Sequence, residues 1–184
     1  METDVTTGKI RLRKVRDGDA DDLAAAWRDQ SEVYAALDPD LFVVPDAEGL
    51  GPWLVEGLAS QADPDRRLVL VADIDGEAAG FLVAAVIPPH AAADRQSQRD
   101  LARVRVQIEA LAVQRAHWRR GVGSRLLRAA EDWARNRGAL TISAQAFVRG
   151  PAREFLNERG YAPQATVFGK RLSASAESQP GNRP

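Results

Sequence analysis

The segment between Val104 and Gly138 has the order strand, loop, helix, and it constrains the fold of this chain more than any other segment. Apolar and polar residues alternate from Val104 to Val113, which predicts a strand with one covered face. The loop contains Arg119-Arg-Gly-Val-Gly-Ser124, and helix-spaced apolar residues follow it until Gly138 ends the helix. This order brings backbone N–H groups, two arginines and a helix N-terminus around one space that suits an anion such as pyrophosphate.

The loop sequence is compatible with more than one role, because a basic helix start with glycines for packing has the same pattern. The dinucleotide-binding pattern fails, since Leu126 stands where its third glycine belongs. The Walker pattern fails as well, since the chain contains no Gly-Lys-Ser or Gly-Lys-Thr. Two interpretations of the loop therefore remain, namely an anion-binding site of another kind and a basic helix start whose glycines serve packing.

The flanking segments predict one sheet of mixed strand direction. Three strands in succession lie between helical segments, which favours an α/β domain of the α+β type over a doubly wound sheet. Asp75-Gly76 is a strong signal for a tight hairpin. The expected strands are 10–15, 68–72, 78–87, 104–113 and 140–145, with one or two more in 161–172. Helices are expected after Asp19 and Asp46 and over 121–137 and 152–158, with loops at 31–45 and 90–102.

The length of 184 residues suits one domain with a sizeable core. We expect residues 1–8 to be a flexible N-terminus, residues 9–172 a single domain, and residues 173–184 a disordered polar tail. Three tryptophans fall on apolar helix faces and are expected in the core: Trp27, Trp53 and Trp133.

Composition argues against several classes of function. The formal net charge is −1, so no global field favours nucleic acid or a membrane surface as a partner. The chain has no cysteine and only two histidines, which excludes thiolate chemistry and argues against a multi-histidine metal site, so we expect no metal. No apolar run approaches the roughly 20 residues of a membrane helix. The acidic, polar N-terminus is unlike a signal peptide, so a cytoplasmic protein is expected.

Short segments on both sides of the loop form an ordered set. They are Ile10-Arg-Leu-Arg, Asp19-Ala with Leu23, Leu68-Val-Leu-Val-Ala, Asp75-Gly-Glu with Gly80-Phe-Leu-Val, Leu111-Ala-Val, the loop with Leu126-Leu, Trp133-Ala with Gly138-Ala, and Ala152-Arg-Glu-Phe-Leu-Asn-Glu-Arg-Gly-Tyr161. No single segment is specific. In this order, however, they resemble the GNAT superfamily of acyl-CoA-dependent N-acyltransferases over about residues 9–172.

The resemblance implies a GNAT fold, with a central mixed sheet of about six or seven strands and about four flanking helices. A bulge in the fourth strand would splay it from the fifth and open a V-shaped cleft. The donor would be acetyl-CoA, whose pantetheine arm meets backbone groups of the fourth strand and whose pyrophosphate lies in the loop. The residues implied for the donor are Leu111, Ala112, Val113, Arg119, Arg120, Gly121, Val122, Gly123 and Ser124.

Three positions depart from the family pattern. Trp118 stands where the family motif begins with Gln or Arg, although Arg119 and Arg120 remain for the phosphates. Leu156 occupies the place of the tyrosine that often protonates the departing CoA thiolate, and Arg149 occupies that of a frequent asparagine. The usual general acid is therefore missing or is supplied from elsewhere.

Transfer to an amine requires a neutral amine, and alkyl amines are protonated near neutral pH, so a general base is needed. Glu109 is the first candidate, with a solvated strand carboxylate as the alternative. Strand alternation predicts that Gln107, Glu109 and Leu111 share a face, and Gln107 is a candidate for positioning a water. The backbone N–H of Val113 is a candidate donor to the oxyanion.

An apolar segment near the end of the first helix is the candidate acceptor pocket, with plain packing as its alternative. Its residues are Tyr34, Leu37, Asp38 and Phe42. We expect Tyr161 to be a core residue rather than a replacement acid, and His117 to be a partly exposed loop residue.

These observations predict an N-acetyltransferase that moves an acetyl group from acetyl-CoA to a primary amine by direct transfer in a ternary complex. Without cysteine, an acyl-cysteine intermediate is impossible. The alternative is a catalytically weak acyl-CoA-binding or sensor domain of the same fold. The acceptor can be a small molecule or a peptide, and a monomer or a homodimer is expected.

Overall fold

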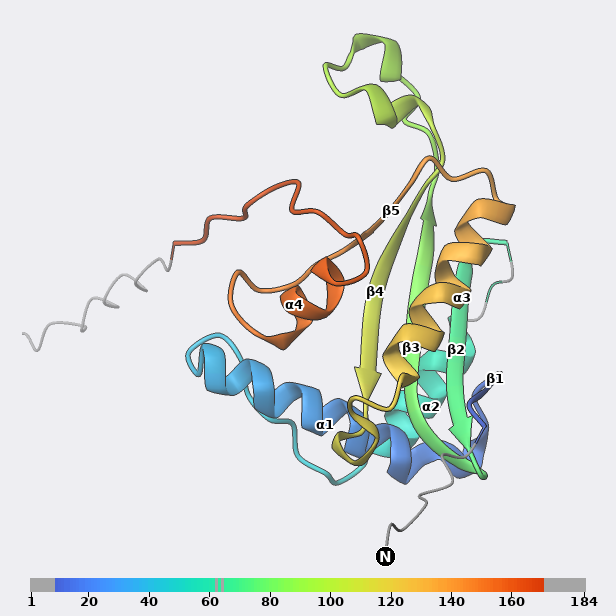
Figure 1. The fold of residues 1–184 in the computed structure, drawn as a ribbon, viewed down its shortest axis with the longest axis vertical. Coiled ribbons are helices and arrows are strands. Elements are labelled where there is room, and N and C mark those ends of the chain that lie inside the picture. Colours follow the sequence, from blue (N-terminus) through green and yellow to red (C-terminus); the bar gives the residue numbers. More distant parts are fainter. Residues whose placement is uncertain (1–8, 62, 64, 171–184) are drawn as a thin grey trace, which may run out of the picture.

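The computed structural model describes residues 9–61, 63 and 65–170, and these contain one mixed sheet of five strands (Figure 1). The strands follow one another across the sheet in chain order, and only the last pair is parallel. They are β1 (Arg11–Arg13), β2 (Arg67–Ile74), β3 (Glu77–Ile87), β4 (Arg105–Val113) and β5 (Thr141–Ala144). The predicted mixed α/β class is confirmed, whereas the tails predicted at 1–8 and 173–184 lie outside the described residues.

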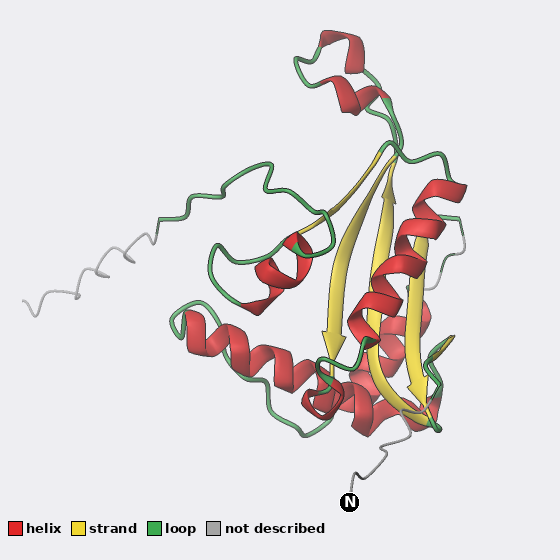
Figure 2. Cartoon of the chain, viewed as in Figure 1, coloured by secondary structure: helices red, strands yellow, loops and turns green. Residues whose placement is uncertain are grey.

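The described part of the chain has four α-helices, of which the first three cover the two faces of this sheet and the last lies beside it (Figure 2). They are α1 (Ala20–Leu37), α2 (Leu50–Ser60), α3 (Val122–Asn136) and α4 (Pro151–Asn157). Short 3-10 turns lie at Asp17–Asp19, Ala93–Arg95, Arg99–Ala102 and Arg115–His117. Among the described helices, none combines the length and the apolar character that crossing a membrane would require.

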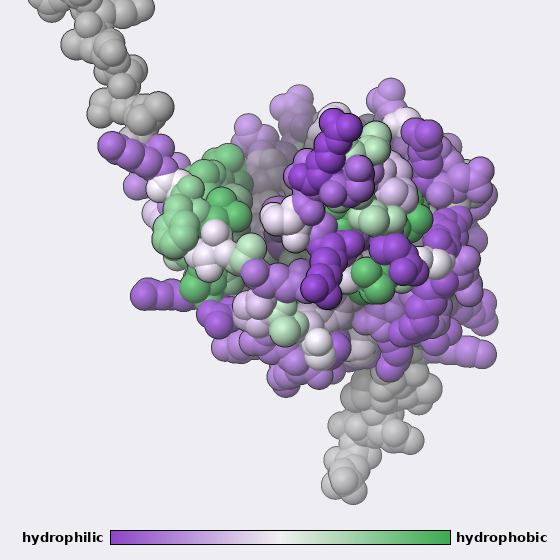
Figure 3. Space-filling view, turned by 90° about the horizontal axis from the view of Figure 1, so that it is seen from above, coloured by the Kyte–Doolittle hydropathy of each residue, from purple (hydrophilic) through white to green (hydrophobic). Residues whose placement is uncertain are grey.

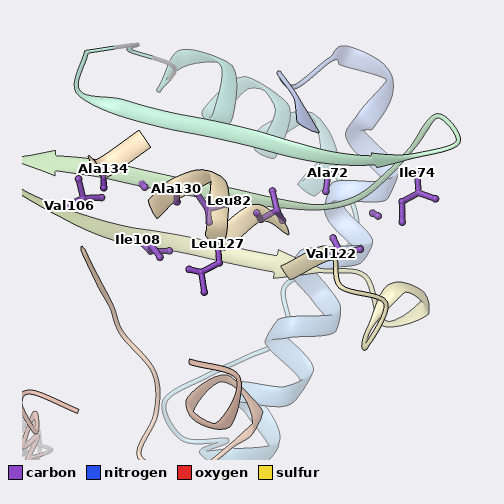
Figure 4. Close-up of a cluster of buried hydrophobic side chains, with 12 residues drawn as sticks. Ala72, Ile74, Leu82, Val106, Ile108, Val122, Leu127, Ala130 and Ala134 are labelled. Atoms are coloured by element: carbon purple, nitrogen blue, oxygen red, sulfur yellow. The ribbon is translucent and has the colours of Figure 1, made fainter. Parts of the chain in front are cut away.

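Two hydrophobic clusters, one on each face, hold the helices to the sheet. Beneath α3, Leu82 and Val106 of the sheet meet Leu127 and Ala130 of the helix (Figure 4). On the other face, α1 and α2 cover a second cluster around Phe81. Successive strand residues alternate between the two clusters, as the pleat of a strand buried on both faces requires.

The first helix is longer than predicted and the second starts later. Residues 31–37 continue α1 instead of forming a loop, because no Gly or Pro interrupts them before Asp38-Pro39, and the Asp38 N–H bonds the Tyr34 carbonyl at 3.0 Å. The second helix begins at Leu50 after Gly49, which has φ 70°, rather than at Asp46. Trp53 is 63% exposed on that helix, so its predicted core position is wrong.

The one or two closing strands predicted within 161–172 are absent from the described part of that segment, so the sheet is smaller than the six or seven strands expected. Val167 and Phe168 are 88% and 92% exposed there. Figure 3 shows hydrophobic surface beside the segment that leads to the grey C-terminal residues. A β-rich pattern forms a strand only where a partner edge pairs with it, and this segment pairs with none of the described strands.

A partly buried ion-pair network fastens β1 to β2 and to the start of α1. The guanidinium of Arg13 donates to both carboxylate oxygens of Asp19 at 2.7 Å and to Asp73 at 2.6 Å. Asp19 also accepts the backbone N–H of Arg16, and Asp73 accepts that of Gly76. The hydrogen bond from Arg13 lowers the pKa of Asp73 below its ordinary value.

We expect Arg13→Gln to lower the free energy of unfolding by about 3 kcal/mol at neutral pH, because it leaves two shielded carboxylates without their cation. The stabilisation from Asp73 is present above the carboxyl's unfolded pKa and is lost as the pH falls through its lower folded pKa. The difference between wild type and variant should therefore shrink toward about pH 3. Urea unfolding at both pH values measures this, with exposed Arg11→Gln on the same strand as a control that changes stability by less than about 0.5 kcal/mol.

Candidate functional site

A bulge in β4 separates this strand from β5. Val83 of β3 pairs with Ala110 and Ala84 pairs with Ile108, so Glu109 between them has no partner in β3. The parallel pairing of β4 with β5 stops at Ile108, next to the bulge. The predicted bulge and the parting of the fourth and fifth strands are thus both present.

A cleft of about 500 Å³ lies where the two strands part. It extends from Glu109 at the bulge along the end of β4 to the start of α3, and the end of β5 and the helix α4 form its opposite wall. Arg120 is not among the described lining residues, but the other residues expected to bind the donor all line this cleft: Leu111, Ala112, Val113, Arg119, Gly121, Val122, Gly123 and Ser124.

The bulge also changes which β4 side chains share a face. Leu111 and Val113 pack with Val106 in the cluster beneath α3, whereas Ala110 and Ala112 belong to the cluster under α1 and α2. The prediction that Gln107, Glu109 and Leu111 share a face is therefore wrong, because the extra residue reverses the alternation. Gln107 lies in β4 opposite Ala85, before the bulge, and it is not among the described residues that line the cleft.

Glu109 lines the cleft and is held by an arginine. Its carboxylate accepts a hydrogen bond from Arg67 at 3.2 Å, and both side chains are 35% exposed. Arg67 is fixed in turn by a 2.6 Å bond to the side-chain carbonyl of Gln61, at the end of α2. The carboxylate thus has a defined position and still meets solvent.

The loop before α3 has the geometry of an anion-binding helix start. Arg119 and Gly121 adopt positive φ angles of 62° and 84°, which turn the chain sharply into the helix. The N–H of Arg125 bonds the Gly121 carbonyl at 3.0 Å, so the N–H groups before it lie in the first turn, where a helix offers no carbonyl partner. A Cβ added to Gly123 would lie 3.2 Å from the ring of Phe155, so this glycine also lets α4 approach.

His117 is buried rather than partly exposed, and it links the loop to the β2–β3 hairpin. Its Nε2 lies 3.1 Å from the carboxylate of Glu77, and its Nδ1 lies 3.1 Å from Arg120. Because a guanidinium only donates, Nδ1 accepts from Arg120 and Nε2 donates to Glu77. Arg120 is therefore directed to His117, while Arg119 faces the cleft.

Trp118 joins the loop to the end of β4. Its indole N–H donates to the carbonyl of Val113 at 2.7 Å, and the guanidinium of Arg115 lies 5.3 Å from its ring centroid. Arg115 is bound in turn by Asp29 and Glu32 of α1. The departure from the family motif at this position therefore supplies a structural contact between strand and loop.

Arg159 is a site residue that the sequence did not reveal. Its Nε and Nη2 donate to the hydroxyl of Ser124 at 3.0 and 2.6 Å, and its guanidinium lies 3.9 Å from the ring of Phe155. It adds a second cation to the cleft beside Arg119. No local pattern identifies it, because 35 residues separate it from Ser124.

The four predicted acceptor residues lie together at the end of α1, but only Tyr34 is among the described residues that line the cleft. Its ring packs against Phe42 at 5.3 Å and against Phe147, a residue that the sequence did not suggest, at 5.4 Å. Leu37 packs against Gly150, and the side chain of Asp38 accepts the N–H of Leu41 at 3.1 Å. Tyr34 itself accepts a hydrogen bond from the side chain of Gln30 at 3.1 Å.

Tyr161 packs against the cluster beneath α3, as expected, and its hydroxyl bonds Glu131 at 3.3 Å. Burial and the neighbouring Glu131 raise the pKa of Tyr161 well above its ordinary value, which makes it a weak proton donor. Leu156 lines the cleft at the place of the family tyrosine. Among the described residues, no group of three or more His, Asp and Glu side chains is placed to hold a metal ion.

Solved structures of several proteins share this fold. A tetramutant of a Bacillus halodurans protein has a TM-score of 0.71 and 17% identity, and the match covers 89% of this chain and 99% of the other. An aminoglycoside acetyltransferase from an uncultured soil metagenomic sample has a TM-score of 0.57 and 21% identity, covering 90% and 99%. A Trypanosoma brucei acetyltransferase has a TM-score of 0.56 and 15% identity, covering 89% and 100%.

No curated protein sequence matches the chain. The model of one protein family, however, matches residues 25–161, which include the bulge, the cleft and the loop before α3. On this match, the chain belongs to the acetyltransferase (GNAT) family.

Proposed function

We propose that this protein transfers an acetyl group from acetyl-CoA to a primary amine of a small molecule or a peptide, within a ternary complex. The observation that carries the proposal is the continuous cleft that connects Glu109 at the bulge with the start of α3. A thioester bound along β4 would have a phosphate site at one end and a carboxylate at the other. This geometry supports the proposal, in which the loop binds the donor and Glu109 accepts the proton.

The donor half uses backbone groups and two cations. The backbone N–H groups of Gly121 to Ser124 would donate hydrogen bonds to the pyrophosphate, and the guanidinium groups of Arg119 and Arg159 would neutralise its negative charge. The pantetheine arm would lie beside residues 111–113 of β4, which run along the cleft. The bonds of Arg159 to Ser124 hold its guanidinium beside this phosphate site.

In the transfer step, the neutral amine nitrogen attacks the thioester carbonyl, and a C–N bond replaces the C–S bond. Glu109 takes the proton that the amine loses, and the CoA thiolate leaves. The N–H of Gln114 bonds the Ala79 carbonyl at 3.0 Å, so the next pair, Val113 with Gly80, is a non-hydrogen-bonded pair of the antiparallel ladder. The N–H of Val113 therefore points away from β3 and is the donor to the oxyanion in this proposal.

Thiol release from acetyl-CoA across a panel of amines tests the activity directly. The panel would include polyamines, aminoglycosides, lysine-containing peptides and peptides with free N-termini. We expect release that depends on both acetyl-CoA and one class of amine. Micromolar CoA binding without thiol release from any amine would instead identify an acyl-CoA-binding or sensor domain.

We expect Glu109→Gln to reduce kcat/KM by about 100-fold or more, because the amide cannot accept the proton. Arg67→Gln is the matched control, since it breaks the same ion pair from the other end and keeps the carboxylate. Arg67→Gln should retain most of the activity and show a similar loss of stability. If both variants lose activity equally, the ion pair matters for structure and Glu109 is not the base.

We expect Gly121→Asp to weaken CoA binding about 100-fold relative to Gly121→Asn, measured by calorimetry. Asp and Asn have the same shape and both tolerate a positive φ such as 84°, and no atom lies within 4 Å of the added Cβ, so the two variants differ mainly in the charge near the phosphates. Equal affinities of the two variants for CoA would show that this loop does not hold the pyrophosphate.

A further inference from the structure

Apolar side chains gather where the end of α1 meets the segment after β5, beside the cleft. In Figure 1, the end of α1 and the loop after it lie beside the segment that leads into α4. The rings of Tyr34, Phe42 and Phe147 pack on one another across this junction, with centroids 4.8 to 5.4 Å apart, and Tyr34 lines the cleft. Of the nine large apolar side chains that are exposed among the described residues, four lie on these same segments: Leu37, Leu41, Val43 and Val148. Exposed apolar surface is thus concentrated at this junction.

These apolar groups are not part of the core that holds the helices to the sheet. Val33 and Tyr34 line the cleft from α1, but neither belongs to the two hydrophobic clusters or packs against them. Phe42 and Phe147 lie outside both clusters as well. Apolar side chains that line a cleft without serving the core are typical of a binding surface, and a ligand with an apolar body gains free energy by covering them.

The charges that line the cleft are divided unevenly between its two ends. Arg119, Glu158 and Arg159 lie at the end near the start of α3. At the other end, Glu109 is the only Asp, Glu, Lys or Arg among the described lining residues, and it already accepts a hydrogen bond from Arg67. A polyamine or an aminoglycoside would bring further ammonium groups against apolar walls, and a shielded charge without a partner is costly. The charge distribution therefore suits an acceptor with a single amine.

We infer that the acceptor is a small monoamine with an apolar body, such as an alkylamine or an arylalkylamine. Its nitrogen reaches Glu109, and its body lies against Val33 and Tyr34 of α1. This inference rests on the proposed function and names the substrate class of the same site. The transfer step is unchanged: a C–N bond replaces the C–S bond, the amine proton passes to Glu109, and the CoA thiolate leaves.

Hexylamine and cadaverine form a matched pair of acceptors, because they have the same length and differ only in a terminal methyl or ammonium group. With acetyl-CoA as donor and thiol release as the readout, we expect kcat/KM to be roughly 100-fold higher for hexylamine, after correction for the two equivalent amines of cadaverine. Along the series propylamine, butylamine, pentylamine and hexylamine, kcat/KM should rise about fourfold for each added CH₂.

Val33→Asp places a carboxylate on the apolar wall, and Val33→Asn is its matched control, because the two new side chains have the same shape. Val33 packs in neither hydrophobic cluster, so both variants should fold. Both should use hexylamine less well, since both remove the apolar contact. Only Val33→Asp should raise the ratio of kcat/KM for cadaverine to that for hexylamine, by roughly fivefold relative to Val33→Asn, as one partly exposed ion pair predicts.

A wild type that uses cadaverine as well as hexylamine would overturn the inference, and so would activity confined to polyamines, aminoglycosides or peptides. Equal ratios for Val33→Asp and Val33→Asn would overturn it too, since they show that the acceptor body does not reach this wall. All of these results leave the proposed acetyl transfer intact. Absence of thiol release with every amine would overturn the proposed function and the inference with it.

Discussion

One extra residue in β4 determines where this molecule has a cleft. Because Glu109 has no partner in β3, the strand twists locally and the side chains beyond it change faces. Leu111 and Val113 then cover the cluster beneath α3, and β5 leaves β4 after Ile108. A regular β4 would permit continuous pairing with β5, and the space that now connects Glu109 with the start of α3 would be closed by backbone hydrogen bonds.

Polar contacts fix the end of the cleft that lies at the loop before α3. The side chain of Gln114 donates to the carbonyl of Ala78 at 3.0 Å, and Asp22 of α1 accepts the N–H of the same residue at 2.8 Å. His117 connects the loop before α3 to Glu77, the residue before Ala78. Since α1, β3 and the loop converge on one point, the binding surface is organised before a ligand arrives, which lowers the entropy cost of binding.

Local sequence patterns predict most of this fold but not its irregularities. The turn at Asp75-Gly76 follows from its residues, because both adopt the positive φ angles that Asp and Gly tolerate. A bulge in the fourth strand followed only from the family resemblance, and its position at Glu109 was not predicted, because the sequence there alternates as a regular strand does. Local patterns also fail to predict that residues 161–170 form no strand, because strand formation there depends on a distant edge rather than on local propensity.

The proposed donor and acceptor parts of the site differ in how well the sequence predicts them, and the difference bears on how each part can change by substitution. The proposed donor half is contiguous between Leu111 and Ser124 and would rely largely on backbone groups, so a short motif predicts it, whereas Arg159 of the proposal comes from a distant segment. The predicted acceptor half joins α1, the loop after it and the segment after β5, which meet through the rings of Tyr34, Phe42 and Phe147. Because these rings pack on one another, a change in any one moves the others. Under the proposed function, acceptor specificity would therefore change through substitutions in three separate segments while the proposed donor half keeps its geometry.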